Sequence, residues 1–217
     1  NSFRKLKKTA VYLLMILFHD CAVMAQSWNS VDGGANKQIQ ASVASIYCYK
    51  DTLFVGGSFD TLGGMKMVGA GKWDGIKYDS IGNFYGAPYS FVSHNNSLYV
   101  GGYFQKINGN SNNRYVAKYN GAGWDSVGGS AFHGAEVLCL ASYNGDLYAA
   151  GWFSSQTVPG MMRIGRWDGS QWNALGTGIT GSVTRVNCMA VYNGELYIGG
   201  EFGAANGMPA PYIVKWN

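Results

Sequence analysis

Histidine and acidic side chains are the first to consider for catalysis or metal binding. After the first 25 residues the chain has two histidines, His94 and His133, which are far apart in the sequence and lack the ligand spacing of a metal site. Glu136, Glu195 and Glu201 are isolated, so no carboxylate pair suited to glycoside hydrolysis can be identified. The sequence therefore predicts no catalytic residue, no metal site and no cofactor.

The aspartates and glycines of the chain fit turn formation better than chemistry. Asp74 and Asp168 both precede a glycine between apolar runs, which is the composition of a tight turn. Each Gly-Gly pair lies within or after a strand-like run, and none opens a helix as a phosphate-binding loop does. An enzyme is therefore the weaker class of function.

A repeated segment organises the chain. The run from Asn193 to Phe202, Asn-Gly-Glu-Leu-Tyr-Ile-Gly-Gly-Glu-Phe, has three near-copies, with its second glycine at positions 57, 102, 151 and 200. The steps of 45, 49 and 49 residues indicate a repeat architecture.

Each repeat is expected to contain four short antiparallel strands. One tight turn precedes the Gly-Gly strand, at Lys50-Asp51, Asn95-Asn96, Asn144-Gly145 and Asn193-Gly194. A second, of two or three residues, follows the aromatic residue at Asp74-Gly75, Asn120-Gly121 and Asp168-Gly169. No stretch after Ala25 has helical periodicity. The sequence predicts an all-β fold, a β-propeller built of four-stranded antiparallel blades.

The recurring glycines and aromatics are expected to be structural. A side chain at Gly56 or Gly57 would collide with the next strand or blade, because these glycines lie inside an apolar strand. Aromatic residues recur in every repeat and are expected in the core between blades. They are Phe59, Phe104, Phe153 and Phe202, with Trp73, Tyr119, Trp167 and Trp216.

The apolar strand ending in Gly-Gly, the following aromatic and the later Trp resemble the kelch motif. The fuller pattern, Leu-Tyr-Val-Gly-Gly-x-Phe … Lys-Trp-Asp-Gly-x-x-Trp, is similar to secreted propellers of Gram-negative bacteria that use type IX secretion, and to fungal cortical polarity-marker propellers. The resemblance covers about residues 28–217 and implies a propeller. Tyr78 and Tyr119 replace Trp in repeat 2 of the pattern, and Ala150 replaces a glycine.

Four blades are expected, at about residues 41–82, 88–128, 135–176 and 183–217. The chain begins with Asn1 instead of Met and ends at Asn217, within an expected Trp-Asn-Gly turn. We therefore expect a fragment, an incomplete ring with more blades in the whole protein. The alternative is a four-blade ring closed by pairing of Trp28–Val31 with Tyr212–Trp216.

The first 25 residues have the order of a secretory signal peptide, with cleavage after Ala25 and the repeats at 26–217. A basic start precedes the apolar run Ala10–Phe18, which is too short to span a bilayer, and small residues follow at Val23-Met24-Ala25. Cys21 raises a lipoprotein alternative. The leader carries +3 of the net charge of +4. The remainder, near +1, is too little for nucleic-acid recognition.

Three cysteines follow the leader, Cys48, Cys139 and Cys188. Cys139 and Cys188 occupy one position in neighbouring repeats, where their separation should exceed the ~5.5 Å between Cα atoms that a disulfide prefers. All three are expected to be small buried hydrophobes.

The leading hypothesis is a non-catalytic, secreted or cell-surface propeller that binds or scaffolds protein or glycan. The alternative is the propeller domain of a secreted enzyme whose catalytic residues lie in missing blades or another domain; a third class is a structural spacer. The longer connections differ among repeats and should gather on one face. The expected ligand contacts there are large residues, Phe84, Tyr85, Phe132, His133 and Trp152. A flat set of exposed Trp and Tyr would favour glycan, and a mixed patch would favour protein.

Overall fold

The computed structural model describes residues 30–37, 40–182 and 184–217. The compact unit of residues 31–217 holds every described strand. The expected signal peptide and the expected strand that begins at Trp28 lie outside the described residues, apart from Ser30 and Val31, which form no strand.

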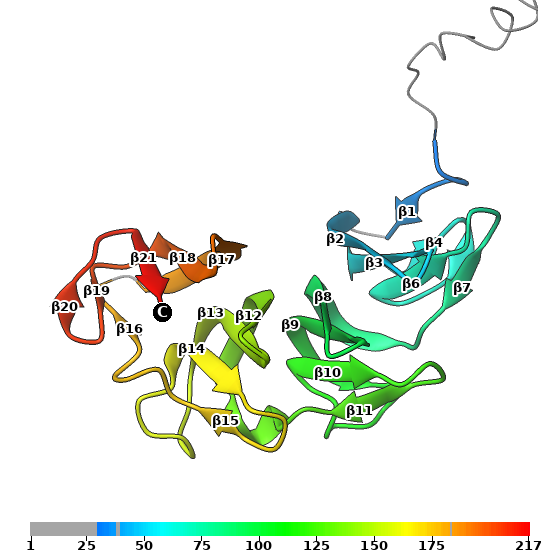
Figure 1. Cartoon of the computed structure of the whole chain (residues 1–217). Coiled ribbons are helices and arrows are strands. Elements are labelled where there is room, and N and C mark those ends of the chain that lie inside the picture. Colours follow the sequence, from blue (N-terminus) through cyan, green and yellow to red (C-terminus); the bar gives the residue numbers. More distant parts are fainter. Residues whose placement is uncertain (1–29, 38–39, 183) are drawn as a thin grey trace, which may run out of the picture. The chain divides into compact units, whose positions relative to one another are not determined.

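The described chain forms four larger antiparallel sheets, which follow one another along the sequence (Figure 1), and two small three-stranded sheets. Sheet 1 contains β2 (Ser42–Tyr49), β3 (Thr52–Ser58), β6 (Ala70–Trp73) and β7 (Tyr78–Ser80). Sheet 2 contains β8 (Phe84–His94), β9 (Ser97–Ile107), β10 (Val116–Tyr119) and β11 (Trp124–Ser126). Sheet 3 contains β12 (His133–Tyr143), β13 (Asp146–Ser154), β14 (Met162–Trp167) and β15 (Trp172–Asn173). Sheet 4 contains β17 (Arg185–Tyr192), β18 (Glu195–Glu201) and β21 (Ile213–Trp216).

The predicted all-β class is confirmed, and sheets 1, 2 and 3 have the predicted four strands, whereas sheet 4 has three. The described residues contain no α-helix, and their single helical element is the 3₁₀ turn η1 (Gly129–Ala131). Sheet 2 begins at Phe84, earlier than the expected residue 88, because the segment before Pro88 continues the first strand.

The turn between the first two strands of each sheet has positive φ at both central residues, as a type I′ hairpin requires. Asn144 and Gly145 have φ of 48° and 83°, and Lys50 and Asp51 have 48° and 58°. The other two hairpins repeat this geometry at Asn95-Asn96 and Asn193-Gly194. The predicted turns are confirmed at all four positions.

The turn between the third and fourth strands is longer than predicted. Trp73 pairs with Tyr78, so residues 74–77 form a four-residue loop in place of the predicted turn of two or three residues. The Asp74 carboxylate accepts hydrogen bonds from the backbone N–H groups of Ile76 and Lys77 at 2.8 and 2.9 Å. Side-chain capping therefore sets the loop length, a feature of Asp and Asn that the dipeptide pattern does not reveal.

A β-bulge in the first strand of every sheet explains the second glycine of each Gly-Gly pair. The pairing register shifts at the same place in all four sheets, for example between Val137 and Cys139. A Cβ atom on Gly151 would collide with the carbonyl oxygen of Glu136 beside the bulge. The first glycine instead faces the following sheet, since a Cβ on Gly101 would meet Val137 at 2.7 Å. The predicted close approach is confirmed, with a different partner for each glycine.

The hydrophobic core lies between successive sheets. Phe54 of sheet 1 is buried with Phe91 and Phe104 of sheet 2, and Tyr99 of sheet 2 with Leu140 of sheet 3. A third cluster joins sheets 3 and 4 through the residues Cys139, Ile164, Val186 and Ile198. Sheets 2 and 3 therefore each contribute to two of these cores, as in a stacked repeat protein.

Polar bonds between sheets accompany this packing. The Tyr49 hydroxyl donates to the carbonyl of Asn96 at 2.6 Å, and the Tyr143 hydroxyl donates to that of Gly194 at 2.9 Å. Tyr49 and Tyr143 end the first strands of sheets 1 and 3, and the accepting carbonyls lie in the hairpins of the following sheets. The same register position therefore links a sheet to the next one.

The longer connections are more ordered than predicted. We call the end of the sheets with the type I′ hairpins the turn end and the opposite end the loop end. At the loop end, β1 (Ala35–Asn36) pairs with the hairpin of β4 (Thr61–Leu62) and β5 (Met65–Lys66). In the same way β16 (Ile179–Thr180) pairs with β19 (Ala204–Ala205), next to β20 (Met208–Pro209). The variable connections are therefore partly built into small sheets of their own.

Candidate functional site

Two of the five predicted ligand contacts belong to the core. Phe84 is 0% exposed and Phe132 is 4% exposed. The ring of Phe132 packs edge-on against Phe153 and Trp172, with centroids 5.0 and 4.9 Å away. Phe84 makes the corresponding edge contacts with two aromatic rings of sheet 2. Both side chains are unavailable to a ligand, because the connections they were assigned to fold back as strand and 3₁₀ turn over the aromatic core.

The other three predicted contacts are exposed but do not gather at one place. Tyr85 is 52% exposed beside the Lys106 ammonium, which lies 4.2 Å from its ring centroid. His133 is exposed at the start of β12. Trp152 is 53% exposed on β13 and lines a cleft with residues of sheet 4. Trp152 therefore has neighbouring side chains that could complete a binding site.

The Trp152 cleft lies at the loop end and has a volume of about 380 Å³. Trp152 comes from β13 and Arg163 from β14, whereas Arg185 and Glu201 come from the paired strands β17 and β18. Trp152 holds the position after the second glycine, where the other repeats have Ser58, Tyr103 and Glu201. The described residues lining this cleft are Trp152, Arg163, Ser182, Thr184, Arg185 and Glu201.

The arginines of this cleft are held differently. Arg163 donates through Nε to the carbonyl oxygen of Thr184 at 2.8 Å and through Nη1 to that of Phe153 at 2.6 Å. Burial lowers the pKa of Arg163 below its usual value, but these bonds keep its guanidinium satisfied. Arg185 is more exposed and pairs with Glu201 at 3.2 Å. The cleft thus offers an indole face next to a fixed and a freer guanidinium.

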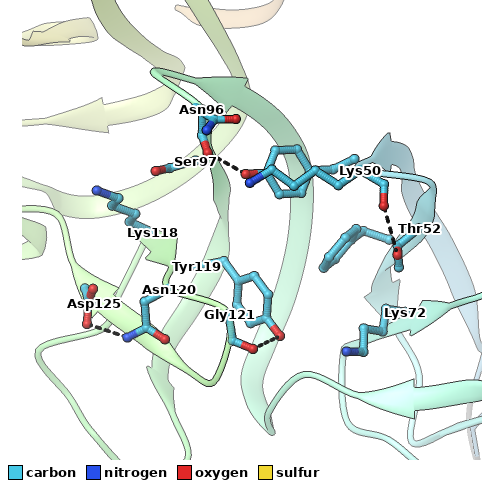
Figure 2. A pocket seen from close by; sticks show the side chains of 12 residues that line it. Lys50, Thr52, Lys72, Asn96, Ser97, Lys118, Tyr119, Asn120, Gly121 and Asp125 are labelled. Atoms are coloured by element: carbon cyan, nitrogen blue, oxygen red, sulfur yellow. Dashed lines mark hydrogen bonds between the residues drawn. The ribbon is translucent and has the colours of Figure 1, made fainter.

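A second cleft, of about 460 Å³, lies at the turn end between sheets 1 and 2 (Figure 2). It is basic, since Lys50, Lys72 and Lys118 line it against the single carboxylate of Asp125. Its remaining lining is aromatic or uncharged and polar, from residues Tyr49, Thr52, Phe54, Asn96, Ser97, Tyr119, Asn120 and Gly121.

Sequence reasoning missed this basic cleft, because it ranked the ends of the sheets by how much their loops vary. The hairpins at the turn end are alike in length, and a cleft between two neighbouring sheets leaves no trace in loop length. The sequence does hold a signal at the position after each hairpin. Repeats 1 and 2 have the uncharged Thr52 and Ser97 there, whereas repeats 3 and 4 have Asp146 and Glu195.

The surroundings of His94 are structural. His94 is 4% exposed, with its Nδ1 2.9 Å from the Ser142 hydroxyl and its Nε2 3.1 Å from the Asn95 amide. Burial lowers the pKa of His94 below 6.5, and Lys118 acts in the same direction against Asp146. The described residues contain no cluster of three or more potential metal ligands from His, Cys, Asp and Glu.

The cysteines correct one prediction. Cys139 is buried, and burial raises the pKa of its thiol well above the usual value. Cys48 and Cys188 are exposed, contrary to the expectation that all three are buried. Cys188 shares its register position with Cys139, but only Cys139 is covered by a following sheet among the described residues. None of these three cysteines forms a disulfide.

No known family model matches the chain, and no curated protein matches it. Within the described residues, no helix has the length and apolar character needed to cross a membrane.

Proposed function

We propose that the chain is part of a non-catalytic β-propeller, secreted or displayed at the cell surface, that binds a glycan in the Trp152 cleft. The observation that carries the proposal is an exposed indole at a repeat position where the other three repeats have Ser, Tyr and Glu. A residue that differs among repeats is not needed for the packing that the repeats share. A large apolar side chain that is exposed at such a position therefore favours a role in ligand binding.

The glycan class follows from the chemistry around Trp152. A sugar ring has an apolar C–H face that packs on an indole, and hydroxyl groups at its rim. The Arg185 guanidinium supplies donors and the Glu201 carboxylate supplies acceptors at that rim. Tyr103 occupies the same position in the preceding sheet and is 43% exposed, so a second aromatic side chain is exposed at the loop end.

Packing between sheets supports the proposed propeller architecture. Each sheet covers the next at the same positions, and the resemblance to kelch-type and type IX secretion propellers agrees with that arrangement. Tyr192, at the position of the buried Tyr143, is 65% exposed, and Ile46 on sheet 1 is also 65% exposed. Apolar faces of this kind are normally covered. We propose that further blades cover these faces in the whole protein, so that the four described sheets are part of a larger ring.

Thiol labelling of the whole secreted protein tests the ring proposal. Cys188 should resist a thiol reagent in the native state as well as Cys139 does, because a following blade would bury both. Peptide mapping after labelling gives the two rates in one sample. Rapid native labelling of Cys188 with continued protection of Cys139 would mean that no blade covers sheet 4.

A glycan array with the whole secreted protein tests the binding proposal, followed by titration of the best ligand against Trp152→Ala. We expect Trp152→Ala to weaken binding at least about tenfold, which corresponds to ~1.4 kcal/mol, without a change in melting temperature. Ile76→Ala is the matched control, since Ile76 is 84% exposed at the turn end. Absence of any glycan ligand, or equal loss in both variants, would refute the proposal. A protein captured in its place through the same cleft would refute the glycan class.

A further inference from the structure

Sheet 3 has an arginine at a position where the other three sheets have no charged residue. The position lies at the start of the third strand, four residues before the aromatic that ends the strand. The four residues are Gly69, Tyr115, Arg163 and Tyr212. All four have positive φ, between 62° and 78°. The backbone at this position is therefore the same in each repeat, and only sheet 3 places a cation on it.

The side chain at this position faces the connection to the following sheet. Tyr115 of sheet 2 packs on Phe132, which directly precedes sheet 3, with ring centroids 6.2 Å apart. Arg163 contacts Thr184, which directly precedes sheet 4, and its Nε donates to the carbonyl oxygen at 2.8 Å and to the hydroxyl at 2.9 Å. Sheet 3 therefore has a guanidinium where sheet 2 has an apolar contact.

No described carboxylate neutralises Arg163. Its Nη1 donates to the carbonyl oxygen of Phe153 at 2.6 Å, so its described partners are carbonyl and hydroxyl oxygens. These groups hold the guanidinium in place but carry no net charge. None of the four ion pairs of the described chain includes Arg163. It is a fixed cation without a counter-ion.

The recurring basic residue on the third strand differs from Arg163 in this respect. It lies one residue before the strand-ending aromatic, at Lys72, Lys118, Arg166 and Lys215. On the strand of Arg163 itself, Arg166 contacts the Asp146 carboxylate at 3.1 Å. Arg163 has neither the recurrence nor the carboxylate, so the design shared by the repeats does not account for it.

The Trp152 cleft has an excess of positive charge. Arg163 and Arg185 line it against Glu201, and two guanidinium groups against one carboxylate leave a net charge of +1. Glu201 is committed within sheet 4, because it contacts Arg185 at 3.2 Å and accepts a hydrogen bond from the Asn187 amide at 3.3 Å. Burial lowers the pKa of Arg163, so its charge is disfavoured in the free cleft. A bound anion would remove that penalty.

We propose that the glycan bound in the Trp152 cleft is acidic, and that its carboxylate or sulfate group pairs with the Arg163 guanidinium. The inference rests on the proposed function, since it names the ligand class of the same cleft. A guanidinium presents its N–H donors in one plane, which suits the oxygens of such an anion. The Arg163 Nη2 donates to no described residue. The bonds to backbone carbonyls fix the guanidinium before the ligand arrives, which lowers the entropy cost of binding.

Isothermal titration with an oligogalacturonate and its methyl ester tests the inference in the whole secreted protein. The two ligands share their length and ring structure, and esterification removes the charge of the carboxylates. A sulfated oligosaccharide of similar length tests the other anion, and poly-glutamate tests an acidic peptide. We expect at least one acidic saccharide to bind about tenfold or more tightly than the ester. The difference should shrink as salt rises, because salt screens charges.

Variants of Arg163 test whether this residue is the one that recognises the anion. Arg163→Gly introduces the residue that sheet 1 has at the same position. We expect it to lower the affinity for the acidic saccharide roughly tenfold or more and to leave the affinity for the ester unchanged. Arg163→Gln keeps a hydrogen-bond donor near Thr184 without the charge, and it is the second neutral variant if glycine disturbs the fold.

Two control variants separate the anion contact from other effects. Arg166→Met removes an equal charge from the same strand, at a cation that Asp146 neutralises, and should leave the preference for the acidic saccharide intact. Trp152→Ala should weaken binding of the acidic saccharide and of the ester by the same factor, because both ligands have the ring that packs on the indole.

The outcomes distinguish this inference from the proposed function. Equal affinities for the ester and both acidic saccharides would overturn the inference and leave glycan binding in the cleft standing. Absence of binding by every saccharide would overturn both. Equal loss of acid and ester binding in Arg163→Gly and Arg163→Gln would show a purely structural role for Arg163 and overturn the inference. Tighter binding of poly-glutamate than of either acidic saccharide would overturn it as well.

Discussion

The turn ends of sheets 1 and 2 and of sheets 3 and 4 share one backbone design and differ in how they treat the same cation. In sheets 3 and 4, Asp146 and Glu195 neutralise Arg166 and Lys215. In sheets 1 and 2, Lys72 and Lys118 form no ion pair with a described residue. A repeated charge can therefore be structural in one repeat and available for binding in another.

The comparison shows that the role of a residue in a repeat protein depends on the residue that it contacts. Tyr49, Tyr143 and Tyr192 are identical residues at one register position, and their roles still differ. The first two donate to the following sheet, whereas Tyr192 is 65% exposed. Residue type alone does not distinguish these cases, but the neighbouring sheet does.

The largest expected effect concerns the predicted contact that lies in the core. Phe132→Ala should destabilise the fold by about 3–5 kcal/mol, because it removes a buried ring that packs on Phe153 and Trp172. Tyr85→Ala, at an exposed aromatic, should change the free energy of unfolding by less than about 0.5 kcal/mol. Urea denaturation measures both. A Phe132→Ala protein as stable as Tyr85→Ala would show that the aromatic cluster does not support the sheet stack.

The next effect compares two identical residues. Tyr143→Phe should cost about 0.5–1.5 kcal/mol, because the variant leaves the Gly194 carbonyl without its 2.9 Å donor. In the 217-residue chain Tyr192→Phe should cost almost nothing, since Tyr192 is 65% exposed there and no described residue accepts a hydrogen bond from its hydroxyl. Thermal and chemical denaturation of the two variants give the difference. Equal costs would contradict the claim that the following sheet decides the role of this position.

A smaller effect is expected from moving the counter-ion between repeats. Asp146→Asn should cost less than about 1 kcal/mol, because the ion pair with Arg166 is partly exposed. Thr52→Asp should raise stability by a similar or smaller amount through a new pair with Lys72. The gain should disappear in 1 M salt, which screens exposed charges. A Thr52→Asp variant that is less stable than the original chain would show that Lys72 already has a partner.

The smallest effect is a change in pH dependence at His94, which replaces the tyrosine of the other repeats. Burial lowers the folded-state pKa of His94 below 6.5, so the unfolded chain binds the proton first as pH falls. Stability from the neutral ring is complete above pH 6.5 and is lost as pH falls through the lowered pKa. His94→Tyr should flatten the stability profile between pH 7 and 5. An unchanged slope would mean that other groups titrate in that range.

The carboxylates of Asp74 and Asp168 titrate at lower pH than His94, so they do not contribute to the stability change measured in the His94 test. Hydrogen bonds from backbone N–H groups lower the pKa of Asp74 and Asp168 below 3.8. Their contribution to stability is present above that value and is lost only as pH falls below it.

The strand order and the hairpins could be predicted because they depend on local chemistry. Asn144-Gly145 specifies positive φ wherever it occurs, and the period of the Gly-Gly pair locates each repeat. The burial of Phe132 could not be predicted, because it depends on where Phe153 and Trp172 lie in space. For the same reason the exposure of Cys188 was missed. Its position predicts burial, and only the absence of a covering sheet among the described residues exposes it.

The candidate sites were predicted less well than the fold. Trp152 was identified because it breaks the repeat within one strand. The basic cleft needs residues from two sheets, and no spacing in one chain shows that Lys72 and Tyr119 line the same space. Comparing repeats position by position for missing partners, as with Thr52 and Asp146, is the sequence signal that comes closest to finding it.

Double-mutant cycles test most directly whether sheets 1 and 2 differ from sheets 3 and 4 in how they hold the repeated cation. We expect a coupling free energy of about 0.2–1 kcal/mol between Asp146 and Arg166 and between Glu195 and Lys215, because these residues form ion pairs. The coupling of Thr52 with Lys72 and of Ser97 with Lys118 should be close to zero. Equal coupling in all four sheets would contradict the account.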